Sequence, residues 1–313
     1  MNGTKPVLLL KRDVDVGAWV SALKRYMPQL EVRVWPQTGP RAEIDFALLW
    51  EPPAELFDDL NRLRVIFSVG AGIDHLLSCS ALPRHVPIVR MVEPGLTAGM
   101  VEYVLYNVLR FHRSLDRYED LQRVAHWSVL PQVRAENRSI GIMGLGVIGQ
   151  AVAGRLLSFG FQVHGWSRTR KSIDGVVSFS GHSELHKFLP MAEILVILLP
   201  STKATVGLVN AGLIAHLPHG AFLINAGRGD LICEGDLLRA LDEDRLAGAA
   251  LDVFAHEPLE AGHRFWSHPR VRVTPHAASI TNADSAAEHV VNNIHRWQRG
   301  QPLTHLADVE RGY

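Results

Sequence analysis

The sequence predicts an α/β protein with two doubly wound parallel-sheet domains. Three observations lead to this fold class. The chain has 313 residues, which is enough for two domains of roughly 150 residues each. Short apolar runs rich in β-branched residues alternate with helical patterns along the chain. These runs are unbroken rather than alternating, as in strands whose sheet is covered by helices on both faces.

The composition is that of a globular protein, with 47% apolar and 20% charged residues. The 32 basic and 32 acidic residues cancel, so no net field attracts nucleic acid or anionic lipid. The apolar runs are too short to span a bilayer, and the first residues lack a signal-peptide pattern. The two cysteines, Cys79 and Cys233, form neither a zinc motif nor a disulfide framework. We therefore expect a cytoplasmic enzyme with no metal, membrane or nucleic-acid partner.

The elements follow one another in two sets. A long helix over residues 97–125, with Thr97 as its N-cap, separates them, and a last helix covers 286–299. We place the first domain at residues 1–100 and 282–313 and the second at residues 101–281. The first set of strands covers 7–10, 32–34, 46–49, 65–69 and 88–89, with a helix at 16–26, and the second covers 140–143, 163–166, 194–198, 221–225, 249–252 and 271–273.

A glycine-rich loop follows the first strand of the second set. Gly144-Leu145-Gly146-Val147-Ile148-Gly149 lies between the apolar run 139–143 and a helical stretch, 150–158. This order is typical of dinucleotide sites, in which the glycines allow a tight turn, close approach to the diphosphate and close helix packing. The free N–H groups of the helix N-terminus then bind the diphosphate. The alternative is a glycine-rich turn without a ligand.

The next predicted strand leads into Ser167, Arg168 and Thr169, with more basic residues after them. An NAD site carries an acidic residue here to bind ribose hydroxyls, and residues 150–173 contain none. Arginine binds a 2′-phosphate through charge-assisted hydrogen bonds. We therefore expect NADPH, with NADH less favoured; the alternative is a solvated basic loop.

Three further segments begin where predicted strands end, at the edge where such sheets bind ligands. They carry Arg228, Glu257 and His276. Arginine binds a carboxylate and polarises a carbonyl, and histidine, whose reference pKa is about 6.5, donates a proton. A glutamate beside the imidazole raises the imidazole pKa. Together they suit the reduction of a 2-keto acid, although each alone is also consistent with a surface or loop residue.

With these motifs in place, the sequence resembles the D-isomer-specific 2-hydroxyacid dehydrogenases over nearly its whole length. The spacing from Arg228 to Glu257 to His276 agrees with that family. Residues 166–171, 49–53 and 126–131 are most similar to its glyoxylate/hydroxypyruvate reductase A branch. Two departures are Ala277-Ala278, where many relatives have glycines, and residues 91–95, which lack an asparagine of the wider family. The other matching pieces are residues 69–74, 144–149, 198–200, 225–229, 252–254 and 275–276.

The resemblance implies a flavodoxin-like substrate-binding domain, a Rossmann-type NAD(P)-binding domain and a homodimer formed through the latter. It implies direct hydride transfer from NADPH that reduces glyoxylate to glycolate or hydroxypyruvate to D-glycerate. Arg228 is then the substrate clamp, and His276 with Glu257 is the proton donor. Besides the glycine loop, the expected cofactor contacts are Ser167, Arg168, Thr169, Leu199, Pro200, Ala226, Gly227, Arg228, Asp252, His276 and Ala278.

The substrate contacts expected in addition to Arg228 and His276 are Ala71, Gly72, Trp50 and Met100. Glycines around Ala71 let backbone N–H groups approach a carboxylate, with a plain tight turn as the alternative. Trp50 ends a predicted strand and narrows the site for small acids, or else packs in the core. Met100 is expected as a wall and Tyr103 as a core residue.

Two other functions stay open from the sequence. One is a dehydrogenase for another 2-hydroxyacid, although no basic cluster near Trp50 suits a phosphorylated one. The other is an NAD(P)-sensing binding protein, since some relatives are corepressors. Turnover of any small 2-keto acid separates enzyme from sensor.

Overall fold

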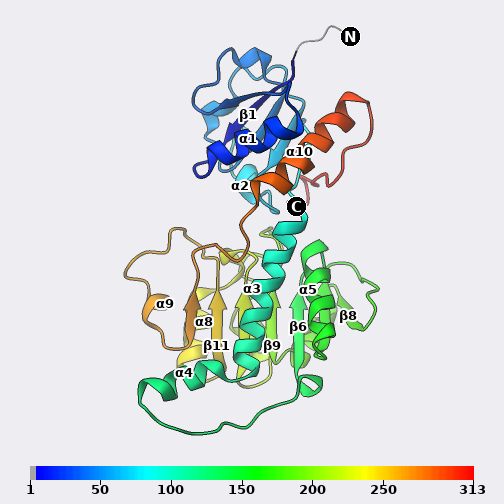
Figure 1. Ribbon diagram of the computed structural model, residues 1–313. Helices are drawn as coiled ribbons and strands as arrows, with labels where there is room; N and C mark the ends of the chain where they lie inside the picture. The colour runs from blue at the N-terminus through cyan, green and yellow to red at the C-terminus, as the bar shows by residue number, and fades with distance from the viewer. Residues whose placement is uncertain (1–4) are drawn as a thin grey trace. The chain divides into compact units, whose positions relative to one another are not determined.

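The computed structural model describes residues 5–313, which divide into two compact units (Figure 1). Unit 1 consists of the described residues up to Leu96 together with Thr281–Tyr313, and unit 2 is Thr97–Ile280. Unit 2 thus begins at Thr97 rather than after residue 100, and the chain leaves it after Ile280.

Unit 1 contains a five-stranded parallel sheet in the order β2-β1-β3-β4-β5. This is the flavodoxin-like order, in which the switch point lies between β1 and β3. Trp50 directly follows β3, and its backbone N–H donates to the Lys11 carbonyl at the end of β1 (2.9 Å). The elements are β1 (Val7–Lys11), α1 (Val16–Tyr26), β2 (Glu31–Val34), β3 (Phe46–Leu49), β4 (Val65–Ser68), α2 (Asp74–Leu77), β5 (Ile88–Val89) and α10 (Ala283–Gln298).

The two faces of this sheet are both buried. Helices α1 and α10 pack on one face, where Trp19, Leu23 and Val290 are fully buried against strand residues. Loops and short helices cover the other face with residues such as Leu56 and Leu76. Burial on both faces explains why the strands read as unbroken apolar runs.

Unit 2 contains a seven-stranded parallel sheet in the order β12-β11-β10-β9-β6-β7-β8. The order reverses between β6 and β9, which is the switch point at which doubly wound sheets bind nucleotides. The elements are α3 (Pro94–His112), α4 (Leu115–Arg123), β6 (Ser139–Met143), α5 (Val147–Ser158), β7 (Gln162–Ser167), β8 (Val176–Ser180), α6 (Leu185–Phe188), β9 (Ile194–Ile197), α7 (Ala211–Ala215), β10 (Ala221–Asn225), α8 (Glu234–Asp242), β11 (Leu246–Leu251), α9 (Arg264–Ser267) and β12 (Val271–Val273).

Helices cover both faces of this sheet as well. Helices α3 and α5 lie over one face (Figure 1), where Val104 and Val152 pack against Ile140 and Val196. The other face packs on α6–α9 through residues such as Leu195. Within residues 5–313, none of the helices combines the length and apolar character that a membrane span requires.

The predicted long helix over 97–125 is wrong in two respects. It begins earlier, at Pro94, because the buried Glu93 carboxylate accepts hydrogen bonds from the backbone N–H groups of Gly95 and Leu96, both at 2.6 Å. Thr97 is therefore not the N-cap. The helix also stops at His112, and Ser114 adopts a left-handed φ of 54° before α4 starts.

Strand β8 was absent from the predicted strands. None of its five residues is fully buried, as expected for the last strand of a sheet, and two of them are serines, so it lacks the unbroken apolar run that marked the others. Its addition extends the sheet beyond β7 and supports the loop that carries Arg168.

Candidate active site

The glycine-rich loop turns sharply between β6 and α5, and two of its glycines are required by packing. Gly144 has a φ of +108°, and a Cβ there would lie 2.6 Å from the Leu198 carbonyl oxygen. At Gly149 a Cβ would lie 1.9 Å from the Gly144 carbonyl oxygen. Gly146 differs, because a Cβ there would meet no protein atom within 4 Å. The absence of a side chain at Gly146 therefore leaves open space at the helix N-terminus.

The start of α5 is suited to an anion. Gly146 is its N-cap and provides no capping side chain, and the first turn carries no acidic residue. The N–H groups of this turn and the positive end of the helix dipole can therefore bind phosphate oxygens. Leu145 is buried and packs under Gly165, Ile148 packs in the core, and Val147 is half-exposed.

The end of β7 has no carboxylate to bind a ribose. Ser167 is buried, and its hydroxyl donates to the Thr169 carbonyl (2.8 Å), which folds the chain back. Arg168 and Thr169 are exposed on this turn. Arg170 instead forms an ion pair with Glu184 and donates to the Ser178 carbonyl of β8. The Arg170 side chain is thus held against β8.

Three neighbouring strands present the remaining predicted groups at one edge of the sheet. Arg228 follows β10, Glu257 follows β11 and His276 follows β12. Because these strands are parallel and adjacent, their carboxyl ends lie together. Leu199 and Pro200 follow β9 at the same edge, and Leu199 is buried.

The turn that carries Arg228 is organised by a buried asparagine. The Asn225 side chain accepts from the Gly227 N–H (3.1 Å) and donates to the Arg228 carbonyl (2.9 Å). At Gly229 a Cβ would lie 1.8 Å from the backbone of Phe254. The segment that includes Ala226 and Gly227 is therefore tightly fixed against the loop after β11, and Arg228 projects from a defined backbone.

His276 and Glu257 form a hydrogen-bonded ion pair. Glu257 accepts from the His276 Nδ1 atom (2.7 Å) and, with its other oxygen, from the Phe254 N–H (2.9 Å). The hydrogen bond to Glu257 raises the pKa of His276 against the opposing effects of burial and of the Arg228 charge. Burial would raise the pKa of Glu257, but the bonds from His276 and Phe254 outweigh it and lower that pKa. The pair therefore favours a charged imidazole, which is the form that donates a proton.

Asp252 lies beneath His276 and holds its backbone. Its carboxylate is buried and accepts from the N–H groups of Ala277 and Ala278, both at 2.9 Å, and from the Thr274 hydroxyl at 2.6 Å. The Thr274 hydroxyl in turn contacts the Tyr103 hydroxyl (3.0 Å). A cofactor that binds Asp252, as expected from the sequence, would therefore share the carboxylate with these three protein donors. Tyr103, expected simply as a core residue, also forms a polar contact.

Ser68 forms hydrogen bonds with the backbone of the predicted carboxylate-binding loop in unit 1. The Ser68 hydroxyl lies 2.8 Å from the carbonyl oxygens of both Gly70 and Gly72. Trp50 packs across Gly70, where a Cβ would lie 3.0 Å from its ring. The rings of Trp50 and His75 are in contact in a tilted arrangement, with centroids 4.3 Å apart and an interplanar angle of 31°. Trp50 and the loop that contains Ala71 and Gly72 are therefore neighbours, as the sequence interpretation requires.

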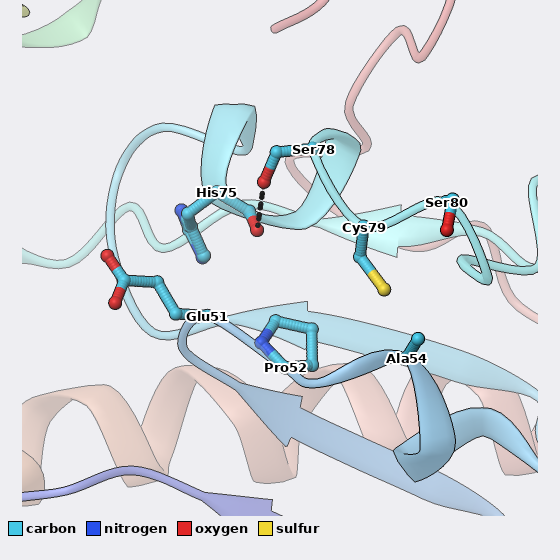
Figure 2. Close-up of a pocket in the computed structure, with 7 residues that line it drawn as sticks. All are labelled: Glu51, Pro52, Ala54, His75, Ser78, Cys79 and Ser80. Carbon is cyan, nitrogen blue, oxygen red and sulfur yellow. Dashed lines mark hydrogen bonds between the residues drawn. The ribbon is translucent and has the colours of Figure 1, made fainter.

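A depression of about 300 Å³ is lined in part by His75 (Figure 2). Its lining includes Glu51, Pro52 and Cys79, and the Cys79 thiol points toward the segment 52–54. It does not include any predicted site residue. Met100, predicted as a substrate wall, lies on α3 in unit 2 and packs against the core beneath that helix.

Sequence reasoning gave no role to Ser68, His75 or Thr274. Ser68 and Thr274 carry no motif of their own, because their importance comes from contacts with residues far along the chain. The only signal in the sequence was their position at the carboxyl end of a predicted strand. Among the described residues 5–313, no cluster of three or more His, Cys, Asp or Glu side chains is suited to a metal ion.

Residues 105–278 match the sequence profile of the D-isomer specific 2-hydroxyacid dehydrogenase NAD-binding domain. The chain is also 43% identical over 300 residues to the glyoxylate/hydroxypyruvate reductase A of Serratia proteamaculans, covering 94% of this chain and 96% of that one. The chain belongs to the D-isomer specific 2-hydroxyacid dehydrogenase family. The resemblance in sequence to the glyoxylate/hydroxypyruvate reductase A branch is thereby confirmed.

Solved structures of the family agree closely with the fold. A D-isomer specific 2-hydroxyacid dehydrogenase from Xanthobacter autotrophicus, in complex with NADPH and MES, has a TM-score of 0.96 and 39% identity over 99% of this chain and 100% of that one. An NADPH-dependent glyoxylate/hydroxypyruvate reductase from Sinorhizobium meliloti, in complex with NADP and sulfate, has a TM-score of 0.94 and 39% identity with the same coverage. The predicted fold class, two doubly wound parallel-sheet domains, is confirmed.

Proposed function

We propose that this member of the 2-hydroxyacid dehydrogenase family is an NADPH-preferring reductase of glyoxylate and hydroxypyruvate, with glycolate and D-glycerate as products. The observation that carries the proposal is the His276–Glu257 pair, 2.7 Å apart, beside Arg228 at the ligand-binding edge of a dinucleotide-type sheet. Similarity to relatives named glyoxylate/hydroxypyruvate reductase A supports this substrate class.

The chain's own residues fit NADPH. The diphosphate would be held by the N–H groups of the loop 144–149, at the open position of Gly146. Arg168 and Thr169 would bind the 2′-phosphate, and Ser167 replaces the acid that would repel it. Leu199, Pro200, Ala226, Gly227, Asp252, His276 and Ala278, from the loops after β9–β12, would border the nicotinamide end. When bound, NADPH supplies the hydride that reduces the keto carbon.

The roles of the catalytic groups follow from their charges. Arg228 binds the substrate carboxylate and polarises the keto oxygen. His276, protonated and held by Glu257 through Nδ1, donates the Nε2 proton to the oxygen as the alcohol forms. Glu257 orients the ring and stabilises its charge, which raises the pKa of the donor.

The substrate-binding domain corresponds to unit 1 and the NAD(P)-binding domain to unit 2 in this proposal. The N–H groups of Ala71 and Gly72 contribute to binding the carboxylate, and Trp50 limits the size of the 2-substituent. The contacts of the Trp50 ring with His75 and with Gly70 support a fixed position for the indole. Met100 is assigned to the wall of the site.

A homodimer through unit 2 completes the proposal. Helix α4 and the segment after it expose several large apolar side chains, among them Val124, Trp127 and Val129, and Trp127 is 97% exposed. A cluster of this kind marks a protein–protein contact, and a second copy of the chain is its proposed partner.

The two free cysteines, Cys79 and Cys233, support a cytoplasmic location.

The test is a set of initial rates with glyoxylate and hydroxypyruvate, each with NADPH and NADH, followed by cofactor absorbance. Fast turnover with NADPH and slower turnover with NADH supports the proposal. Turnover of neither acid, together with tight NADPH binding, contradicts it and favours an NAD(P)-sensing protein or a dehydrogenase for another 2-hydroxyacid. A panel of larger 2-keto acids then separates those two functions.

A further inference from the structure

A chain of hydrogen bonds connects helix α3 to the loop that carries His276. The Thr274 hydroxyl bonds to the Asp252 carboxylate (2.6 Å) and to the Tyr103 hydroxyl (3.0 Å). A hydroxyl has one hydrogen to donate, and the carboxylate can only accept it. The direction is therefore fixed: Tyr103 donates to Thr274, and Thr274 donates to Asp252.

Asp252 fixes the backbone on both sides of His276. Thr274 precedes the histidine, Ala277 and Ala278 follow it, and all three donate to the same buried carboxylate. The His276 N–H itself donates to the Asp252 backbone carbonyl (2.7 Å). His276 has a φ of +53°, a conformation that non-glycine residues adopt only when their surroundings impose it.

We propose that Tyr103 and Thr274 are positioning residues for the proton donor. They act through Asp252 to keep the His276 ring within hydrogen-bond distance of Glu257. This inference rests on the proposed function, in which His276 donates the proton. Neither residue touches the reacting atoms in this scheme. They act by keeping the left-handed turn at His276, and with it the 2.7 Å contact between His276 and Glu257.

The Tyr103 hydroxyl can donate its hydrogen bond to Thr274 at every pH used in the experiment. Burial raises the pKa of Tyr103 to about 12, with smaller contributions from its neighbours. The phenol therefore stays protonated throughout the pH range in which His276 titrates. The packing of α3 depends on apolar side chains such as Val104 and Val108, which are fully buried, so loss of one hydroxyl leaves the helix in place.

The experiment compares Thr274→Val, Thr274→Ser and Tyr103→Phe, with Tyr106→Phe as the matched control. Tyr106 lies one turn further along α3 and is exposed. Three quantities are measured: kcat with glyoxylate, the dissociation constant for NADPH, and the pKa of the His276 imidazole by NMR in the ligand-free protein. His276 is surrounded by Glu257, Asp252 and Arg228, all of which these variants retain.

A shift of the donor by about 1 Å can cost on the order of 10²-fold in rate. We expect Thr274→Val to lower kcat about 10- to 100-fold on that scale, Tyr103→Phe to lower it less, and Thr274→Ser to restore most of it. NADPH affinity should stay nearly unchanged. The His276 pKa should fall toward its ordinary value in Thr274→Val and Tyr103→Phe but not in Tyr106→Phe.

The inference is overturned if Tyr103→Phe and Thr274→Val match Tyr106→Phe in both kcat and the His276 pKa. If Thr274→Val does not fold, the comparison of Tyr103→Phe with Tyr106→Phe tests the inference by itself. Failure of the proposed function is distinguishable. Full activity in His276→Ala removes the histidine from catalysis, whereas the NMR titration still reports whether Tyr103 and Thr274 set its environment.

Discussion

Replacing Glu257 by glutamine removes the charge of the His276 partner with little change in shape. Glu257 accepts two hydrogen bonds, from the Phe254 N–H and from His276 Nδ1, one on each oxygen. A glutamine side chain offers one oxygen and one NH₂ group, so it can satisfy only one of these donors. If the oxygen remains with Phe254, the NH₂ faces Nδ1 and favours the neutral imidazole.

The size of the effect follows from the charge-assisted bond that is lost. Hydrogen bonds to charged groups contribute about 1.5–3 kcal/mol. The two side chains are 35% and 34% exposed, so water screens the pair and the lower end applies. The His276 pKa should therefore fall, and since about 1.4 kcal/mol is a factor of ten in the protonation equilibrium, the change should be about tenfold. Above both pKa values, the protonated fraction and the reduction rate should therefore drop about tenfold.

The assay is kcat/KM for glyoxylate from about pH 5 to 9 at saturating NADPH, the range that spans the reference histidine pKa. Because the proton donor is the charged form, activity in both proteins should fall as the pH rises through the His276 pKa. The variant profile should be displaced to lower pH and approach the wild-type rate in acid. Glu260→Gln, an exposed glutamate in the same loop, is the control. Identical midpoints for Glu257→Gln and the wild type would refute the reasoning.

Three further comparisons test the cofactor and substrate ends. Gly146→Ala should weaken NADPH binding about tenfold, or about 1.4 kcal/mol, without loss of thermal stability. Gly149→Ala should instead lower the free energy of unfolding by about 1–3 kcal/mol. Equal effects of the two substitutions on stability would contradict the geometry of the loop. Arg168→Ala should lower kcat/KM with NADPH relative to NADH about tenfold, while Lys171→Ala leaves the ratio unchanged; an unchanged ratio in Arg168→Ala excludes it from the 2′-phosphate. Trp50→Ala should raise kcat/KM for larger 2-keto acids relative to glyoxylate about tenfold, and an unaltered ranking across a graded series would exclude Trp50 from the pocket.

Much of the fold could be predicted from the sequence because buried parallel strands leave an unbroken apolar run. Helix α1 was predicted at residues 16–26 and lies there, since Trp19, Ala22 and Leu23 mark one buried face. Strand β8 lies at the edge of its sheet and has no such run. The break at Ser114 was also missed, because a single residue with a φ of 54° leaves the helical pattern on both sides intact.

The site was predictable where a residue type is tied to a local motif. The glycine loop between β6 and α5 is of this kind, since its strand and helix are adjacent in sequence. The contact of Tyr103 with Thr274 joins residues 171 positions apart, and no local pattern announces it. The cap that Glu93 provides for α3 was missed for another reason. Threonine is a more common capping residue than glutamate, so Thr97 was chosen as the N-cap, although Glu93 accepts the hydrogen bonds at the start of the helix.

The two-donor arrangement at Glu257 has a consequence for the entropy of the reaction. Both oxygens of the carboxylate are occupied by groups of unit 2, one of them a backbone N–H. The ring of His276 is thus oriented before any ligand arrives. A side chain that is already ordered loses no rotational freedom as the proton moves, and its dipole needs no rearrangement at that moment. The free energy of organising the acid is therefore supplied by folding rather than by the substrate.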